Sequence, residues 1–123
     1  MKIYLAASYR RRGTMKKIAA KARRMGHEVV SRWIDGDTEA KEFKRKTRVS
    51  EAIQDLCDII RCKLLIYFSS KGGRGGKDVE LGYALANGKM VWMVGKLRNI
   101  FHHVPFVTFK NADQMLKELG KTE

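Results

Sequence analysis

Two carboxylates follow a glycine-rich loop in the second half of the chain, and this region is the best suited to chemistry. The loop at 70–77 holds four glycines, and Asp78 and Glu80 stand just after it, at the start of a predicted helix. Acids are common at this position because they complement the helix dipole. The same dipole would keep the Glu80 carboxylate ionised, as a nucleophile requires. Glu80 is therefore a candidate nucleophile, the alternative being that both acids serve only the helix.

A basic loop at 8–13 follows the first apolar run and offers a second kind of chemistry. It contains a hydroxyl on Ser8 and three adjacent guanidinium groups, Arg10 among them. Arginine binds phosphate through two parallel hydrogen bonds, and the N–H groups at a helix start favour an anion. The loop is a candidate phosphate site, and a solvated basic turn is the competing interpretation.

The glycine loop does not match the P-loop motif. That motif requires a glycine five residues before the glycine-lysine pair and Ser or Thr after the lysine. Lys71 and Asp78 occupy those positions here. A flexible lid or a source of backbone hydrogen-bond donors is the better interpretation, and a loop without function is the alternative.

Alternating strands and helices must position these groups. Short apolar runs predict five strands, and amphipathic stretches predict the helices between them. The predicted strands are 2–7, 28–33, 63–69, 90–94 and 104–109. The predicted helices are 13–26, a long one capped by Thr38 with a break near 47–50, 78–86, and 112–119.

This alternation predicts a parallel sheet, because each parallel return needs a crossover connection. We expect residues 1–123 to form a single doubly wound, flavodoxin-like α/β domain with a five-stranded parallel sheet. Ligands of such sheets bind beyond the carboxyl ends of the strands, where the winding direction switches. That rule predicts one cleft surrounded by the segments 8–13, 69–80 and 95–99.

Charge and composition narrow the class of protein. The chain has 123 residues, 44% of them hydrophobic, and a net charge of +13. Residues 1–26 contain nine Lys or Arg and no acid. Such an excess fits nucleic-acid binding, an anionic substrate or simple solubility. No apolar run is long enough to span a membrane and no signal pattern is present, so we expect a cytoplasmic protein without a membrane partner.

The cysteines and histidines do not indicate a metal site. Cys57 and Cys62 lie five residues apart on a predicted helix, so two buried free thiols are expected rather than a disulfide. His102 and His103 are adjacent and point apart in an extended chain, which favours a surface or subunit-contact role. Tyr9 and Phe101 are candidates to stack on a base, as is Trp33, whereas Trp92 fits the core.

The helix at 78–89, with the sequence DVELGYALANGK, resembles the signature helix of the nucleoside 2-deoxyribosyltransferase family, which includes 2′-deoxynucleoside 5′-monophosphate N-glycosidases. The match covers most of residues 2–109. The glycine loop is longer and more basic than is usual in that family, and Lys63 replaces a common acid.

The resemblance implies roles for particular residues. Glu80 would be the catalytic carboxylate, Tyr4 would orient it, and Asp55 would bind the sugar. Asp78 would help to protonate the departing base. The implied phosphate and substrate contacts are Ser8, Arg10, Ser69 and Gly76, with Ser70 and Arg74 as further candidates, and Asn99 would serve a neighbouring subunit's site.

The implied reaction breaks the N-glycosidic bond of a 2′-deoxynucleoside or its 5′-monophosphate through a Glu80 glycosyl-enzyme ester. Water would complete a hydrolase, and a second nucleobase a transferase. The scheme places the chain in deoxyribonucleotide metabolism, uses no cofactor and no metal, and implies a homodimer or higher homo-oligomer. The basic loop favours a phosphorylated substrate.

A non-catalytic basic protein that binds a nucleotide or a nucleic acid is the alternative function. The basic first helix and the glycine loop favour it. The sequence holds no recognised nucleic-acid motif, so a nucleic-acid partner is not expected.

Overall fold

The computed structural model describes residues 1–36, 45–105 and 107–123, with the side chains of 45–47 left out. Its described strands form one parallel sheet in the order β2-β1-β3-β4-β5. The strands are β1 (Lys2–Ala6), β2 (Glu28–Val29), β3 (Leu64–Phe68), β4 (Met90–Val94) and β5 (Val107–Phe109). The predicted flavodoxin-like α/β fold is confirmed.

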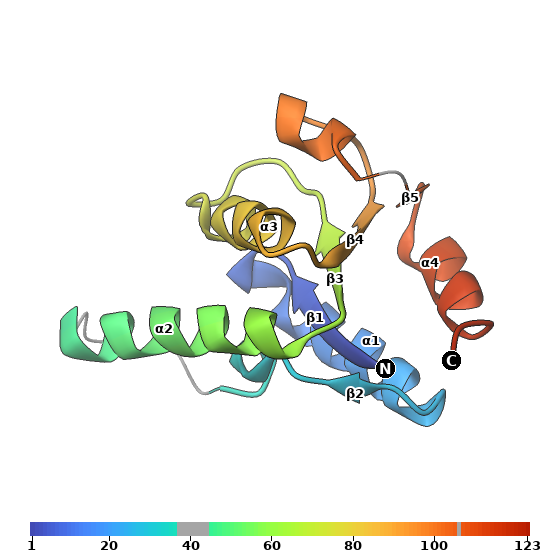
Figure 1. Ribbon diagram of the computed structural model, residues 1–123, viewed down its shortest axis with the longest axis horizontal. Coiled ribbons are helices and arrows are strands. Elements are labelled where there is room, and N and C mark those ends of the chain that lie inside the picture. Colours follow the sequence, from blue (N-terminus) through green and yellow to red (C-terminus); the bar gives the residue numbers. More distant parts are fainter. Residues whose placement is uncertain (37–44, 106) are drawn as a thin grey trace.

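Within the described residues, four α-helices cover the two faces of this sheet (Figure 1). They are α1 (Arg12–Arg24), α2 (Arg45–Arg61), α3 (Gly76–Ala86) and α4 (Ala112–Leu119). Helices α1 and α4 pack on one face, and α2 and α3 on the other (Figure 1). Three short 3-10 helices lie in the connections: η1 (Tyr9–Arg11), η2 (Arg32–Ile34) and η3 (Ile100–His103).

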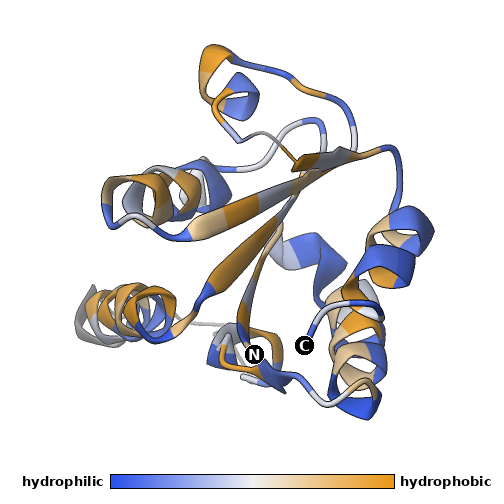
Figure 2. Ribbon diagram, turned by 45° about the vertical axis from the view of Figure 1, so that its right-hand side comes forward, coloured by the Kyte–Doolittle hydropathy of each residue, from blue (hydrophilic) through white to orange (hydrophobic). Residues whose placement is uncertain are grey.

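Alternate residues of the strands pack into two separate hydrophobic cores, one on each face of the sheet. Ile3 and Leu5 of β1 pack with Met15 of α1 and Leu116 of α4. Tyr4 and the other residues of the opposite face pack against α2 and α3. Strand β3 is buried over its whole length, as expected when both sheet faces are covered. Figure 2 shows the apolar strands at the centre of the molecule with hydrophilic stretches on the outer helices.

The second strand is much shorter than predicted, because side chains replace its hydrogen bonds. Val30 still donates to Ile3 O at 2.8 Å. Beyond it, the Leu5 N–H donates to Ser31 Oγ at 3.2 Å, and the Leu5 carbonyl accepts from Trp33 Nε1 at 2.8 Å. With both Leu5 groups satisfied, the chain leaves the sheet and forms η2.

Other boundaries also differ from the prediction. Helix α2 is continuous from Arg45, so the predicted break near 47–50 is wrong, and the predicted cap Thr38 lies outside the described residues. Strand β5 covers only Val107–Phe109 of the predicted 104–109, because Val104 and Pro105, which follow η3, are not part of the sheet. Cys57 is exposed and only Cys62 is buried, which corrects one of the two predicted buried thiols, and both are free.

No helix within the described part of the chain is both long and apolar enough to cross a membrane.

Candidate active site

A cavity of about 940 Å³ opens at the carboxyl ends of β1 and β3. These neighbouring strands are followed by helices on opposite faces, so the cavity lies at the switch point of the sheet. Its walls are the end of β1, η2, the first half of α2, the glycine loop and the start of α3. The segment 95–99, predicted to share this cleft, is not part of its lining.

Glu80 lines this cavity and is held by the first strand. The phenolic hydroxyl of Tyr4 donates a hydrogen bond to Glu80 Oε2. Tyr4 itself is fully buried in β1, and Leu81, the residue after Glu80, is buried against the same core. Glu80 is therefore fixed between a rigid strand and a helix that packs firmly on the sheet.

The protonation of Glu80 differs from the prediction. Helix α3 begins at Gly76, so only Asp78 lies in its first turn and Glu80 falls in the second. The dipole acts mainly within the first turn. Burial instead dominates and raises the pKa of Glu80 from 4.5 to about 8. The raised pKa favours the protonated form of Glu80 in the free protein, whereas a nucleophile needs the ionised form.

Asp55 faces the same cavity from helix α2. Burial and the nearby charges of Asp58 and Glu51 raise its pKa to about 6, against the opposing effect of Arg32. The cavity therefore brings together two carboxyl groups with different pKa values, from elements far apart in the sequence.

An ion pair between buried Asp58 and the partly exposed Arg32 supports the wall between η2 and α2, and no local sequence pattern indicates it. Asp58 is fully buried, and its two oxygens accept from Arg32 Nε at 3.0 and 3.2 Å and from Arg32 Nη2 at 2.8 Å. The Arg32 N–H also donates to Asp58 at 3.1 Å. Arg32 lines the cavity, so Asp58 fixes a cationic side chain one turn away from Asp55.

Asp78 points away from the cavity, which changes the role expected of it. Its carboxylate accepts from the Tyr67 hydroxyl at 2.6 Å and lies 3.1 Å from His102 Nε2. His102 Nδ1 accepts from the Arg98 N–H at 3.0 Å, so Nε2 carries the proton and donates to Asp78. Burial opposes ionisation, but these hydrogen bonds outweigh it and lower the pKa of Asp78. An ionised carboxylate outside the cavity lining is a poor proton donor to a departing base.

The three adjacent arginines of the basic loop have separate roles. Arg11 lies over the Phe68 ring at 5.7 Å, and Arg12 donates to the Tyr9 hydroxyl at 2.7 Å and to the Gly36 carbonyl. Arg10 lines the cavity together with Ser8. Of the three, Arg10 is therefore the one placed to meet a ligand, and it is the arginine that the family resemblance implies.

The glycine loop places both backbone and basic side chains against the cavity, with Lys71 and Arg74 among the lining residues. Gly73 and Gly75 line it with φ of +98° and +87°, a conformation that favours glycine. Gly76, a predicted contact, also lines it. Lys77 is buried and donates to the Gly72 carbonyl at 3.3 Å, which closes the loop on itself.

Three predicted contacts lie elsewhere. Ser69 donates to the Lys96 carbonyl at 2.5 Å and accepts from Arg98 Nε at 3.2 Å, outside the cavity lining. Ser70 Oγ is buried and finds no partner among the described residues. Asn99 caps η3 by accepting from the N–H groups of Phe101 and His102 at 3.0 and 3.2 Å.

An aromatic wall completes the cavity. Trp33 is anchored through Nε1 and lies beside Tyr9, with ring centroids 6.5 Å apart. Both rings line the cavity and offer a surface for a flat group. Phe101 is exposed on η3 and is not part of this wall.

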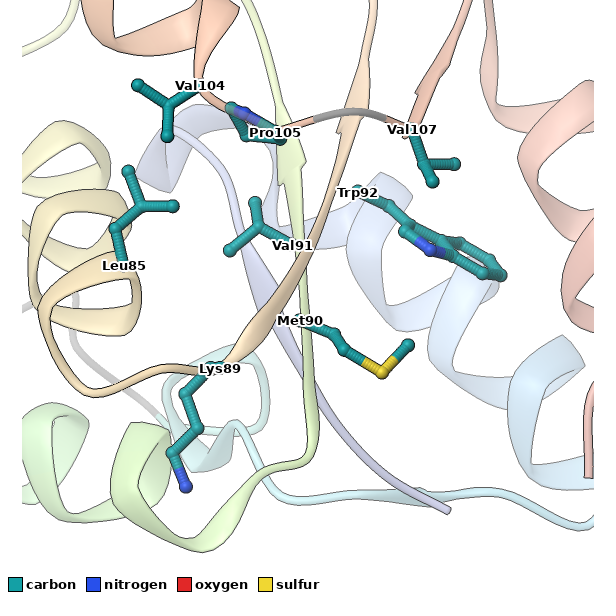
Figure 3. Close-up of a pocket in the computed structure, with 8 residues that line it drawn as sticks. All are labelled: Leu85, Lys89, Met90, Val91, Trp92, Val104, Pro105 and Val107. Atoms are coloured by element: carbon teal, nitrogen blue, oxygen red, sulfur yellow. The ribbon is translucent and has the colours of Figure 1, made fainter.

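A second hollow of about 290 Å³ lies at the other end of the sheet and is mainly apolar. Figure 3 shows Val91 facing Leu85 of α3, whereas Met90 and Trp92 point to the other side of β4. Its one charged side chain, Lys89, points away and donates to the Ile60 carbonyl at 2.6 Å. None of the predicted site residues lines it.

Within the described ranges, no three His, Cys, Asp or Glu side chains are grouped as metal ligands.

Solved structures with this fold include two proteins of named activity. A 2-deoxyribosyltransferase from the psychrotolerant bacterium Bacillus psychrosaccharolyticus has a TM-score of 0.75 and 20% identity, over 94% of this chain and 90% of that one. The CMP N-glycosidase BcmB of Clostridium botulinum has a TM-score of 0.66 and 18% identity, over 97% and 98%. A conserved protein from Enterococcus faecalis has a TM-score of 0.71 and 12% identity, over 100% and 99%.

These likenesses confirm the fold, and two of the similar structures belong to the nucleoside 2-deoxyribosyltransferase family that the helix at 78–89 resembles. No protein-family model matches the sequence, and no curated protein is significantly similar to it.

Proposed function

We propose that the protein cleaves the N-glycosidic bond of a 2′-deoxynucleoside 5′-phosphate, with Glu80 as nucleophile. The observation that carries this proposal is the pairing of Glu80 with Tyr4 at the wall of a cavity that also contains Asp55 and Arg10. The 2-deoxyribosyltransferase and the CMP N-glycosidase of the same fold support the reaction class.

In the first step, a Glu80 oxygen attacks C1′ of the sugar while the C1′–N bond breaks. The base leaves with the electron pair of that bond and takes up a proton from water. The product is a glycosyl ester on Glu80. The Glu80 carboxylate, close to the sugar, stabilises the oxocarbenium-like transition state. The Tyr4 hydroxyl occupies one lone pair of this carboxylate and leaves the others directed to the sugar.

In the second step, an acceptor attacks C1′ and releases the Glu80 carboxylate. Water gives the free 2-deoxysugar phosphate and makes the protein a hydrolase, whereas a second nucleobase makes it a transferase. Asp55 holds the sugar hydroxyl on the α2 side of the cavity. The Trp33–Tyr9 wall offers the stacking surface for the base.

Arg10 and Ser8 support a phosphorylated substrate. They line the cavity beside the glycine loop, whose N–H groups at the start of α3 favour an anion. Ser69 and Asn99 are engaged in local hydrogen bonds, so we do not assign them to the substrate within one copy of the chain.

Assembly into a homo-oligomer belongs to the same proposal. Ile100 is 77% exposed and Phe101 59% exposed on η3, next to Asn99. Figure 2 shows this short segment standing off the sheet with an apolar outer turn. A second copy packed on η3 would cover these side chains.

A panel assay tests the reaction. Wild type and Glu80→Gln are incubated with deoxynucleosides and their 5′-monophosphates, with and without an acceptor base, and free base is measured by chromatography. Base released by wild type alone supports the proposal, and the effect of acceptor separates transferase from hydrolase. No release from any substrate contradicts it.

The basic lining of the cavity also fits a second function, that of a non-catalytic nucleotide- or nucleic-acid-binding protein. Binding of that kind falls steeply with salt and is insensitive to Glu80→Gln, because the contacts are to phosphates. Base release that depends on Glu80 excludes it.

A further inference from the structure

More cationic side chains line the cavity than are paired with other groups of the protein. Six cationic side chains of the described residues line the cavity, and three of these have partners: Arg32 on Asp58, Arg48 on Glu51, and Lys77 on the Gly72 carbonyl. The other three are Arg10, Lys71 and Arg74. Within the described residues they make no ion pair or hydrogen bond, although each faces the same cavity.

One phosphate does not account for this surplus. A phosphate monoester carries roughly two negative charges. Arg10, Ser8 and the N–H groups of the glycine loop are sufficient to hold one. Lys71 and Arg74 come from the glycine loop itself, and among the described residues neither has a paired counter-charge.

The cavity also has space for a longer anion. Its volume of about 940 Å³ is near the top of the roughly 300–1,000 Å³ that small-molecule sites span. Between the two cations of the loop lies Gly73, and Gly75 follows, both with positive φ and no side chain to obstruct the approach. A chain of phosphates can therefore reach the backbone N–H groups as well as the two cations.

We propose that the substrate is a 2′-deoxynucleoside 5′-di- or triphosphate, with Arg10 at the phosphate next to the sugar and Lys71 and Arg74 at the phosphates beyond it. This inference rests on the proposed function for its reaction. The bonds made and broken at C1′ are unchanged, and the phosphate chain leaves intact on the sugar.

The test separates binding from chemistry. Glu80→Gln retains an oxygen that accepts from Tyr4, and it serves for calorimetric titration with a deoxynucleoside mono-, di- and triphosphate in buffer containing a chelator. Wild type is assayed for base release from the same compounds. We expect the triphosphate to bind and react at least tenfold better than the monophosphate.

Removing the charges of Lys71 and Arg74 tests whether these two residues cause the preference for the triphosphate. K71A/R74A is expected to lose that preference, so that the triphosphate and the monophosphate give values within about threefold of each other. K16A/K17A removes the same charge from the exposed side of α1 and is the matched control. Its preference should equal that of wild type.

The outcomes are distinct. A monophosphate that binds and reacts as well as the triphosphate overturns this inference and leaves the proposed function standing. Tighter binding of a 5′-phosphorylated oligonucleotide than of the triphosphate also overturns it, in favour of a nucleic-acid strand. If no base is released, the reaction fails, and the titration alone decides: triphosphate binding lost in K71A/R74A supports the inference, and equal binding of all three compounds contradicts it.

Discussion

The Tyr4 hydroxyl donates a hydrogen bond to Glu80 Oε2 across 76 residues of sequence, and so joins the first strand to helix α3 at the wall of the large cavity. The bond spans the switch point of the sheet. It ties the orientation of the candidate nucleophile to a fully buried residue of the sheet.

Replacing Tyr4 by Phe tests this relationship. The ring still fills the core, but the hydrogen bond, which favours the ionised carboxylate, is lost. We expect kcat/KM for base release to fall by about 10- to 100-fold and the midpoint of its pH dependence to rise. The measurement is a pH–rate profile of both proteins. An unchanged profile would mean that the hydroxyl has no part in the reaction.

The pH dependence of the rate follows from the raised pKa of Glu80. The ionised form attacks, so kcat/KM should climb as the pH rises and reach half of its upper limit near pH 8. Initial rates between pH 5 and 9.5 measure this midpoint. A rate that is already at its plateau at pH 6 contradicts the assignment.

The same shift has a consequence for stability. The folded protein holds the Glu80 proton more tightly than the unfolded chain, so its contribution is fully present below about pH 4.5 and is lost as the pH rises through about 8. Each pKa unit is worth about 1.4 kcal/mol. Glu80→Gln should therefore be more stable than wild type by at least about 2 kcal/mol at pH 9, and this gain should shrink towards pH 5. Urea unfolding at both pH values measures it, and a gain independent of pH would argue against a buried ionisable group.

Asp55→Asn separates substrate binding from the attack. It keeps a side chain of the same size on α2 but removes the charge, so we expect kcat/KM to fall by about 100-fold, with any acidic limb near pH 6 abolished. The matched control is Glu51→Gln, another acid of the same cavity wall. Equal losses in both variants would show that Asp55 has no special position.

Asp78→Asn tests whether Asp78 is structural. The variant weakens the hydrogen bonds from Tyr67 and His102, so the free energy of unfolding should drop by about 1–3 kcal/mol. Below its unfolding temperature, the variant should keep kcat within about fivefold of wild type, because Asp78 lies outside the cavity lining. Loss of activity as deep as that of Glu80→Gln would restore Asp78 as an acid-base group.

Ile100→Glu tests assembly through η3. A charge at the centre of the exposed apolar turn should shift the molecular mass measured by light scattering towards the monomer. Ile53→Glu on α2, another exposed apolar residue, is the control. If the wild-type protein is a monomer, the proposed contact through η3 is contradicted.

The helices and strands whose sequence pattern is local could be predicted from the sequence. Strand β4 and helix α4 have the predicted bounds, because continuous apolar runs and a clear amphipathic period need no tertiary information. The predicted strand 28–33 is shortened to Glu28–Val29 because its boundary depends on tertiary contacts. Ser31 and Trp33 satisfy Leu5 with side chains, and nothing in the local pattern indicates that exchange.

The candidate site also has features that the sequence predicts and features that depend on tertiary contacts. Its location follows from the topology of a parallel sheet, whereas Asp55 was implied only by the family resemblance. The Arg32–Asp58 pair joins residues 26 apart, and the turn of Asp78 towards His102 depends on a residue 24 positions later. The pKa of Glu80 depends on burial, which only the packed chain reveals.

The most direct test is the mass of the protein during turnover. A substrate carrying fluorine at C2′ destabilises the oxocarbenium-like transition state and slows both steps, so the ester should accumulate. Wild type quenched in acid should then gain the mass of the fluorinated sugar phosphate on the peptide that contains Glu80, and Glu80→Gln should gain nothing. Release of base with no adduct, or an adduct on a residue other than Glu80, would contradict the account.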